Sequence, residues 1–204
     1  MRGAFPGFIP KTDQERVQNL SDDLQKWEDE ELTFEVSEKL DGSSMTVYVF
    51  QDDEGVCSRN LNLRESAKNS LWTVCRREQL IEKLRQTGRN LALQGELIGE
   101  GIQGNPYKVK GQEFHLFDIF DIDRGDYLLP QERLTLAKKL GICHVPTMLL
   151  LDIKLDTESL LKRAEGKSQL NANTEREGLV FKCNQDTSVS FKVISNKFLL
   201  KGGN

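Results

Sequence analysis

The sequence predicts an antiparallel α+β fold for this chain of 204 residues. Segments in which apolar and polar residues alternate, as in half-buried strands, outnumber the segments with helical periodicity. The order of elements is mixed, with helices inserted among strands, whereas a doubly wound fold alternates the two regularly. No glycine-rich loop of the Walker or dinucleotide-binding type occurs, so a bound nucleotide would have to be held in another way.

Length and composition indicate a folded chain of one large domain, or of one domain with a small appendage. Hydrophobic residues make up 37% and charged residues 29% of the sequence. A chain of this size buries roughly 70% of its unfolded surface. The net charge of −4 excludes a protein that binds nucleic acid over its whole surface, but it leaves room for a local basic groove.

Targeting and cysteine patterns favour an intracellular protein, in the cytoplasm or, in a eukaryote, in the nucleus or an organelle. No apolar run approaches the roughly 20 residues of a membrane span. Residues 3–10 are too short and too interrupted by prolines for a signal peptide. The cysteines are widely scattered without a Cys-x-x-Cys pair, which predicts free and mostly buried thiols rather than a zinc site or disulfides.

The first 31 residues should form an arm and a helix. Prolines make residues 5–10 an irregular arm. Residues 12–15, Thr-Asp-Gln-Glu, have the form of a capping box and predict that a helix begins there. One face of this helix would carry the apolar residues Val17, Leu20, Leu24 and Trp27.

Three strands should follow. Residues 33–39 read as a strand, and residues 45–50 as its hairpin partner across the turn 41–44. Residues 52–55 then turn the chain into a short strand at 56–59.

The second half alternates helices and strands. Residues 69–87 predict one long helix closed by Gly88. A second helix should begin at Pro130 and end before Gly141, because proline suits the first helical turn and glycine the position after the last. The other predicted elements are strands at 91–97, 114–122, 147–151, 178–183 and 188–194, and a helix at 157–165.

Lys39 is the first candidate for covalent chemistry. It ends a predicted strand immediately before a glycine turn, with Glu38 and Asp41 beside it. Burial and neighbouring cations would lower its pKa and yield a free amine. Such an amine can attack a phosphorus or carbonyl centre. The alternative is a solvated lysine at the end of a strand.

Six ordered motifs resemble those of the covalent nucleotidyltransferases, the superfamily of polynucleotide ligases and mRNA capping enzymes. The first, Glu38-Lys39-Leu40-Asp41-Gly42, fits the Lys-x-Asp-Gly signature. The others are Ser58-Arg59-Asn60, Gly95-Glu96-Leu97, Phe117-Asp118-Ile119, Glu177-Gly178-Leu179-Val180 and Ser190-Phe191-Lys192-Val193. The Gly-Glu-Leu element and residues 8–20 are most similar to the RNA ligases typified by bacterial and protist nick-sealing enzymes.

The resemblance implies the adenylyltransferase fold, with antiparallel sheets flanked by helices and a nucleotide cleft between them. Residues 1–204 would be the nucleotidyltransferase domain, with residues 1–31 as its N-terminal arm and helix. In this group an OB-like domain precedes that domain, and these 204 residues contain none. We therefore expect a domain of a longer ligase.

The resemblance also implies roles for individual residues. Lys39 would attack the α-phosphate of ATP, with Lys192 as the cation on that phosphate and Glu177 as the carboxylate that holds a hydrated Mg²⁺ or Mn²⁺. Arg59 would bind phosphate or ribose, and Glu96 the ribose hydroxyls. Adenine would stack on Phe117 and meet the backbone of Glu38 at its edge, with Asp118 as a further candidate.

Each of these residues has an ordinary structural alternative. Glu96 could be a solvated residue at a strand end, and Phe117 could pack in the core. Arg59 and Glu177 could lie in surface turns. The shared order of all the motifs around Lys39 argues against these alternatives taken together.

The last motif departs from the family pattern. Many ligases have Lys-x-Lys where this chain has Ser190-Phe191-Lys192. Lys197 stands at an odd spacing, so the cation for the β- and γ-phosphates is open, and Lys11 or Arg16 could supply it. Basic residues between 76 and 89 could touch nucleic-acid phosphates, but a solvated helix face is favoured.

The predicted activity is an ATP-dependent RNA ligase that acts as a monomer on RNA, with 5′-phosphate and 3′-hydroxyl ends in a nicked duplex. Sister enzymes of the superfamily, a DNA ligase or an mRNA capping guanylyltransferase, are the alternatives. A binding module without catalysis is a third, and the joint presence of Lys39, Glu96, Glu177 and Lys192 argues against it.

Overall fold

The computed structural model describes residues 1–201, which form two compact units. Unit 1 contains residues 1–12, 42–128 and 132–144, and unit 2 contains residues 13–41, 129–131 and the chain from 145 onward. Each unit is therefore built from separate stretches of sequence, and the chain passes from unit 2 into unit 1 between Asp41 and Gly42.

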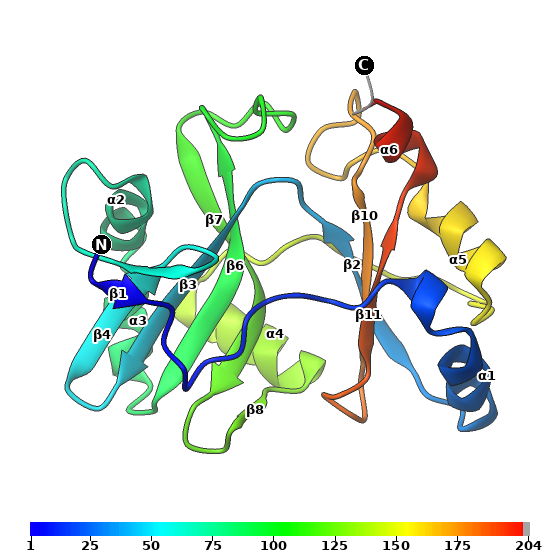
Figure 1. Ribbon diagram of the computed structural model, residues 1–204, viewed down its shortest axis with the longest axis horizontal. Coiled ribbons are helices and arrows are strands. Elements are labelled where there is room, and N and C mark those ends of the chain that lie inside the picture. Colours follow the sequence, from blue (N-terminus) through cyan, green and yellow to red (C-terminus); the bar gives the residue numbers. More distant parts are fainter. Residues whose placement is uncertain (202–204) are drawn as a thin grey trace. The chain divides into compact units, whose positions relative to one another are not determined.

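Unit 1 is built on a seven-stranded antiparallel sheet with the strand order β1-β5-β4-β3-β6-β7-β8 (Figure 1). Its strands are β1 (Gly3–Ala4), β3 (Ser43–Phe50), β4 (Asp53–Cys57), β5 (Leu61–Leu63), β6 (Leu91–Gly99), β7 (Gln112–Asp121) and β8 (Asp126–Tyr127). Its helices are α2 (Ser70–Arg77), α3 (Leu80–Gln86) and, from Glu132 onward, α4 (Pro130–Leu140).

The two faces of this sheet differ in chemistry. One face packs against the helices in an apolar core that includes Val47, Leu93 and Leu116. The other face is apolar at one end, where Ile9 of the arm packs against Tyr48. Its other end is polar, and strand pairing places two rows of side chains there: Ser44, Glu96 and His115, then Thr46, Gln94 and Asp118.

Unit 2 is built on a four-stranded sheet with the order β11-β10-β2-β9 (Figure 1). The strands are β2 (Phe34–Lys39), β9 (Thr147–Met148), β10 (Gly178–Cys183) and β11 (Ser190–Ile194). The helices are a 3₁₀ turn (Val17–Asn19), α1 (Ser21–Asp29), α5 (Thr157–Ala164) and α6 (Asn196–Lys201).

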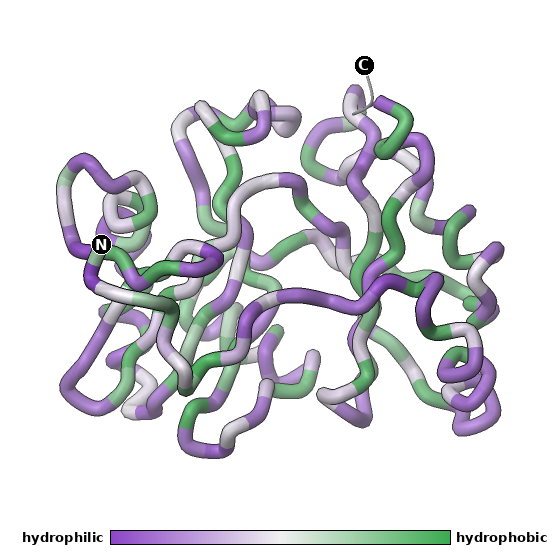
Figure 2. Tube along the Cα trace, viewed as in Figure 1, coloured by the Kyte–Doolittle hydropathy of each residue, from purple (hydrophilic) through white to green (hydrophobic). Residues whose placement is uncertain are grey.

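The sheet of unit 2 also has one apolar and one polar face, because apolar and polar residues alternate along its strands (Figure 2). The apolar face packs against α1 and α5, and the rings of Phe181 and Phe191 stack there with centroids 4.9 Å apart. Lys39, Ser37 and Lys192 have the opposite alternation and occupy the polar face.

Most predicted elements are confirmed. The strand at 178–183 and the helix that begins at Pro130 match the structure, and Gly141 adopts a positive φ of 63° just after that helix. The helix at 157–165 ends one residue early, at Ala164. The four cysteines are free, and three of them are buried. None of the helices in residues 1–201 is long and apolar enough to cross a membrane.

The predicted hairpin between residues 33–39 and 45–50 is wrong. β2 pairs with β10 and β9, whereas β3 pairs with β4 and β6. The two strands belong to different units, so the turn at residues 41–44 is a crossing and not a hairpin loop.

Two helix predictions also need correction. The helix predicted at 69–87 is two helices, broken where Gln79 takes a left-handed φ of 55°. The helix predicted from residues 12–15 begins at Ser21. Residues before Val17 stay extended because the backbone carbonyl of Glu15 accepts a hydrogen bond from Lys192 N.

Several strand limits differ from the prediction. The stretch 52–55 was predicted as a turn, but β4 begins at Asp53 and ends at Cys57. β5 follows it and was not predicted. The strand predicted at 147–151 ends at Met148, and Leu149 and Leu151 are exposed.

Candidate active site

The centre of the candidate site is an ion pair between Lys39 and Glu177. Lys39 is the last residue of β2 and is paired with Gly178, so Glu177 lies at the adjoining end of β10. Lys39 Nζ donates a hydrogen bond to Glu177 Oε1 over 2.8 Å. The side chains are 27% and 15% exposed, respectively. Two residues 138 positions apart are thus in direct contact, half-sheltered from water.

Gly178 makes this arrangement possible. A Cβ atom at position 178 would lie 2.1 Å from the carbonyl oxygen of Val193 on β11. Only glycine lets the backbones of β10 and β11 come this close. The glycine of the Glu-Gly motif therefore sets the position of the Glu177 carboxylate.

Burial perturbs the carboxylates around Lys39. Burial raises the pKa of Glu177, and attraction to Lys39 opposes this effect only in part. Burial likewise raises the pKa of Asp41, again with Lys39 as the opposing charge. These groups are thus costly to ionise unless a cation is present, and the site is suited to hold positive charge.

Lys192 lies on the same polar face as Lys39, on β11, and β10 separates it from β2. It occupies β11, where its neighbour on β10 is Val180. The pKa of Lys192 is lowered, first by burial and then by the positive charges of Lys39 and Arg16. Its ammonium group therefore belongs to the same electrostatic cluster as Lys39 and Glu177.

Glu38, whose backbone is predicted to meet the adenine edge, has several hydrogen bonds within the protein. Its N–H donates to Pro146 O over 2.8 Å, and its carboxylate Oε2 accepts from Gln169 N over 2.8 Å. The side chain is 1% exposed, and burial raises its pKa. Glu38 thus points into the apolar side of the sheet and holds the loop that leads to Glu177.

Sequence reasoning missed the partners of that loop. Arg176 Nε donates to Ala164 O over 2.9 Å, and its NH2 group donates to Glu165 O over 2.6 Å. Ser168 hydrogen-bonds to the carboxylate of Glu38. A buried glutamate next to the nucleophile and an arginine next to Glu177 were the available signals, because buried charges require partners.

The predicted residues Arg59, Glu96 and Phe117 belong to unit 1. Glu96 Oε1 accepts a hydrogen bond from Gly42 N over 3.1 Å. A Cβ atom on Gly42 would lie 2.3 Å from Leu97 O, so this close contact requires glycine. Glu96 therefore contacts the backbone three residues beyond Lys39, on the polar end of the sheet face.

Phe117 sits at a bulge. Gln94 pairs with Asp118 and Gly95 with Leu116, which leaves Phe117 as the extra residue of β7. Bulges redirect side chains and occur often beside active sites. The ring is only partly buried, as a stacking surface for a base requires.

Arg59 and Asp118 are placed differently. Arg59 is exposed in the turn between β4 and β5. Asp118 is buried, 3.9 Å from the guanidinium of the fully buried Arg133. Asp118 thus forms part of the support of the sheet.

The residues predicted from the sequence therefore form two groups. Unit 2 brings together Glu38, Lys39, Glu177 and Lys192, and unit 1 carries the remaining three on or beside one sheet.

A divalent metal would have to be held mostly by water. Glu177 is the best ligand, and Asp41 is close enough to raise its pKa. Residues 1–201 contain no group of three or more His, Cys, Asp or Glu side chains that could enclose a metal. Mg²⁺ and Mn²⁺ commonly bind through one or two carboxylates and keep several waters, so the residues present fit a hydrated ion.

The basic residues on α2 and α3 are already paired. Arg76 binds Glu65 at 2.8 Å and Glu82 at 3.2 Å, and Arg85 binds Glu54 at 3.2 Å. Their charges are largely neutralised by neighbouring carboxylates. This supports the interpretation of a structural helix surface over a nucleic-acid contact.

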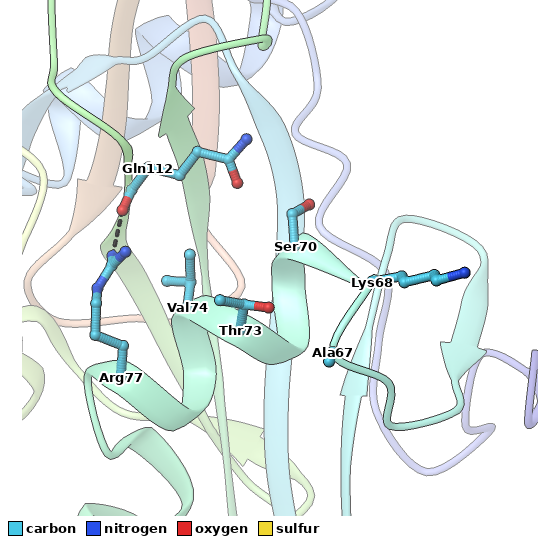
Figure 3. Close-up of a pocket in the computed structure, with 7 residues that line it drawn as sticks. All are labelled: Ala67, Lys68, Ser70, Thr73, Val74, Arg77 and Gln112. Atoms are coloured by element: carbon cyan, nitrogen blue, oxygen red, sulfur yellow. Dashed lines mark hydrogen bonds between the residues drawn. The ribbon is translucent and has the colours of Figure 1, made fainter.

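A hollow of about 280 Å³ lies beside α2 in unit 1 (Figure 3). It is lined by Ala67, Lys68, Ser70, Thr73, Val74, Arg77 and Gln112. Arg77 donates to the backbone oxygen of Gln112 there, and Figure 3 shows Lys68 directed away from both residues. The predicted site residues are absent from its lining.

Comparisons with known proteins agree with this geometry. The family model described as RNA ligase matches residues 32–194. The structure is similar to that of a Naegleria gruberi RNA ligase with pyrophosphate, with a TM-score of 0.92 and 53% identity. A lysine-to-alanine variant of that enzyme with ATP and manganese matches with the same two values. No curated protein sequence matches.

The matched structures are longer than this chain. The alignment covers 98% of this chain but 59% of each of these two Naegleria chains. A further structure, a glutamate-to-alanine variant with AMP and manganese, matches with a TM-score of 0.90 and is covered to 60%.

Proposed function

The chain belongs to the RNA ligase family, and we propose that it transfers AMP from ATP onto Lys39. The observation that carries the proposal is the contact between Lys39 and Glu177 on the polar face of the unit 2 sheet, with Lys192 beside them. A lysine amine, a carboxylate and a second cation are the groups that nucleotidyl transfer to lysine requires.

The reaction begins when Lys39 Nζ attacks the α-phosphorus of ATP. A nitrogen–phosphorus bond forms, the bond from that phosphorus to the bridging oxygen breaks, and pyrophosphate leaves with the bonding electrons. The attacking amine loses a proton. Lys192 offsets the negative charge of the α-phosphate, because a fixed cation in a half-buried site is effective there.

In the structure Lys39 Nζ donates to Glu177 Oε1 over 2.8 Å, so this contact has to open before Nζ can attack phosphorus. A divalent cation bound at Glu177 would compete for the same carboxylate and supply positive charge near the α-phosphate. Glu177 would thus contact Lys39 before the metal binds and the metal afterwards, which would release Lys39 Nζ to approach the α-phosphorus.

For unit 1, we propose that Glu96 accepts hydrogen bonds from the ribose hydroxyls and that the ring of Phe117 stacks on adenine. The hydrogen bond from Gly42 N orients the Glu96 carboxylate. The bulge frees the Phe117 ring from the regular alternation of the strand. Arg59, exposed in its turn, would bind a phosphate or ribose oxygen.

In the whole protein, AMP would pass from Lys39 to an RNA 5′-phosphate, and a 3′-hydroxyl would then displace AMP to form the phosphodiester. We place this reaction at nicks in duplex RNA, carried out by a monomer inside the cell. The matched Naegleria RNA ligase supports the RNA assignment. Segments beyond this chain would contribute to RNA binding, since the net charge of the chain is −4.

Intact-mass spectrometry tests the first step. The chain incubated with ATP and Mn²⁺ or Mg²⁺ should gain one adenylyl group, and GTP should give no corresponding adduct. A guanylyl adduct without an adenylyl adduct would favour a capping guanylyltransferase. Absence of any adduct on the wild-type chain would refute the proposal.

Transfer from the adenylated chain to a nicked RNA duplex, against the same nick in DNA, tests the substrate. Faster discharge onto DNA would favour the DNA ligase alternative.

A further inference from the structure

We propose that Arg16 binds the β- and γ-phosphates of ATP and holds pyrophosphate as it leaves, an inference that rests on the proposed adenylation of Lys39. The last sequence motif lacks the second lysine that many ligases have. Lys11, Arg16 and Lys197 are the nearby candidates in the sequence, and the structure separates them.

Arg16 is held beside Lys192 by the backbone. Glu15 O accepts a hydrogen bond from Lys192 N over 2.8 Å, and Arg16 forms a parallel bridge with Lys192. The residues on either side of Arg16 are also held in place. Ser190 Oγ donates to Gln14 Oε1 over 2.6 Å, and the side chain of Val17 is completely buried. A single isolated bridge and the hydrogen bonds around it therefore hold Arg16 beside β11, at the edge of the sheet of unit 2.

The order of groups across the sheet fits an in-line displacement. From β2 outward, Lys39 is paired with Gly178, next to Glu177, and Lys192 on β11 lies two residues along, in the row of Val180 and Ser37. Arg16 is bridged to Lys192 and comes last in this order. Bridged residues of neighbouring strands point to the same face, and strands are about 4.8 Å apart. The attacking and leaving groups must lie on opposite sides of the α-phosphorus. With that atom near Lys192, the leaving pyrophosphate points away from Lys39 and toward Arg16.

The side chain of Arg16 is available for an anion. It is exposed, and its guanidinium makes no hydrogen bond or ion pair with any other residue from 1 to 201. Its positive charge contributes to the lowered pKa of Lys192, while Asp13 and Glu177 act in the opposite sense. The planar guanidinium can bind two phosphate oxygens at once.

The other two candidates are occupied. Lys11 Nζ donates to Asn60 Oδ1 over 2.9 Å within unit 1. Lys197 lies on α6 and binds Glu165 at 3.0 Å. Neither is paired with β11 as Arg16 is, so Arg16 is the residue that replaces the missing lysine.

The test compares R16A, R16K and K11A with the wild-type chain. The rate of adenylyl-adduct formation is measured against ATP concentration, and the reverse reaction is measured by adding pyrophosphate to the adenylated chain. AMP affinity is measured by calorimetry in parallel. For R16A we expect kcat/KM for ATP and the rate of pyrophosphate-driven reversal to fall about 10- to 100-fold, as for loss of a charge-assisted contact.

AMP lacks the two outer phosphates, so R16A should bind AMP as the wild type does. R16K should restore part of the loss, and K11A should behave as the wild type. If R16A forms the adduct and reverses at wild-type rates, the inference fails while the proposed function stands. Equal losses for ATP and AMP would also refute it, because they indicate a structural role. A wild-type chain that forms no adduct refutes the proposed function itself.

Discussion

Two groups of cations in this protein have opposite surroundings. On α2 and α3 of unit 1, Arg76, Arg77 and Arg85 each pair with at least one glutamate. On the polar face of unit 2, Lys39 forms an ion pair with Glu177, whereas Lys192 and Arg16 form none with any residue from 1 to 201. The first group neutralises itself, and the second leaves positive charge for a ligand.

This difference shows why basic residues in a sequence are a weak guide to anion binding. The segment 76–89 is the more basic of the two in the sequence. Surface ion pairs of this kind add little to stability, typically less than about 1 kcal/mol each. They nevertheless neutralise the guanidinium groups, which are then less able to bind an anion. The site is therefore distinguished by cations that lie close together without an ion pair of their own, as Lys192 and Arg16 do among residues 1–201.

The strongest test of the comparison is loss of the nucleophile. K39M should abolish adenylyl-adduct formation, since no other amine occupies its place at Glu177. The matched control is K83M, because Lys83 lies on α3 and donates to Gly141 O over 2.9 Å. Intact-mass spectrometry should show the adduct on K83M and not on K39M. An adduct of unchanged yield on K39M would place the nucleophile elsewhere.

The next largest effect separates the two groups of cations directly. K192A should slow adduct formation about 100-fold, because it removes the charge proposed to neutralise the α-phosphate. R76A, which removes a cation paired with Glu65 and Glu82, should leave the rate within a factor of two. Single-turnover kinetics with saturating ATP measures both. If R76A is slowed as strongly as K192A, the comparison breaks down.

The metal concentration that adenylation requires should depend on the Glu177 carboxylate. E177Q keeps the shape of the side chain but loses its charge, so the metal concentration for half-maximal adenylation should rise about tenfold or more. E158Q is the control, since Glu158 is a solvent-exposed partner of Lys162 on α5. Titration with Mn²⁺ in a chelator-treated preparation measures the effect. An unchanged metal requirement in E177Q would remove Glu177 as the metal residue.

The smallest expected effect is a shift in pH dependence. The pKa of Lys192 lies below its ordinary value because of burial, Lys39 and Arg16. As pH rises, Lys192 thus loses its charge earlier than an exposed lysine, and adenylation should fall on the alkaline side. Arginine stays charged throughout, so K192R should extend activity to higher pH. A rate-versus-pH profile with the same alkaline limit in both proteins would assign that limit to another group.

Local sequence signals predicted many elements and the membership of the site. α4 begins at Pro130 and ends before Gly141, as predicted. Proline suits the first helical turn and glycine accepts the positive φ that follows the last turn, so both signals depend only on the residue itself. The alternation in 178–183 predicted β10 because one face of that strand is buried. The motif order around Lys39 indicated the family, which the family model and the Naegleria structures confirm.

Predictions failed where partners distant in the sequence decide the conformation. The segment 12–15 has good capping residues, yet it pairs with Lys192 on β11. Gln79 breaks the predicted long helix between α2 and α3, both of which pack into one core. The sequence within these segments does not indicate the pairing with β11 or the break at Gln79.

What the sequence alone determined is therefore the family, the fold class and the identity of Lys39, Glu177 and Lys192 as site candidates. Their chemistry is carried by residue type and motif order, which are local properties. Only the tertiary structure decided that Glu38 anchors a loop, that Arg76 is neutralised and that Arg16 stands beside Lys192. Each of these depends on which strand or carboxylate lies next to the residue, and folding sets that neighbour across long stretches of sequence.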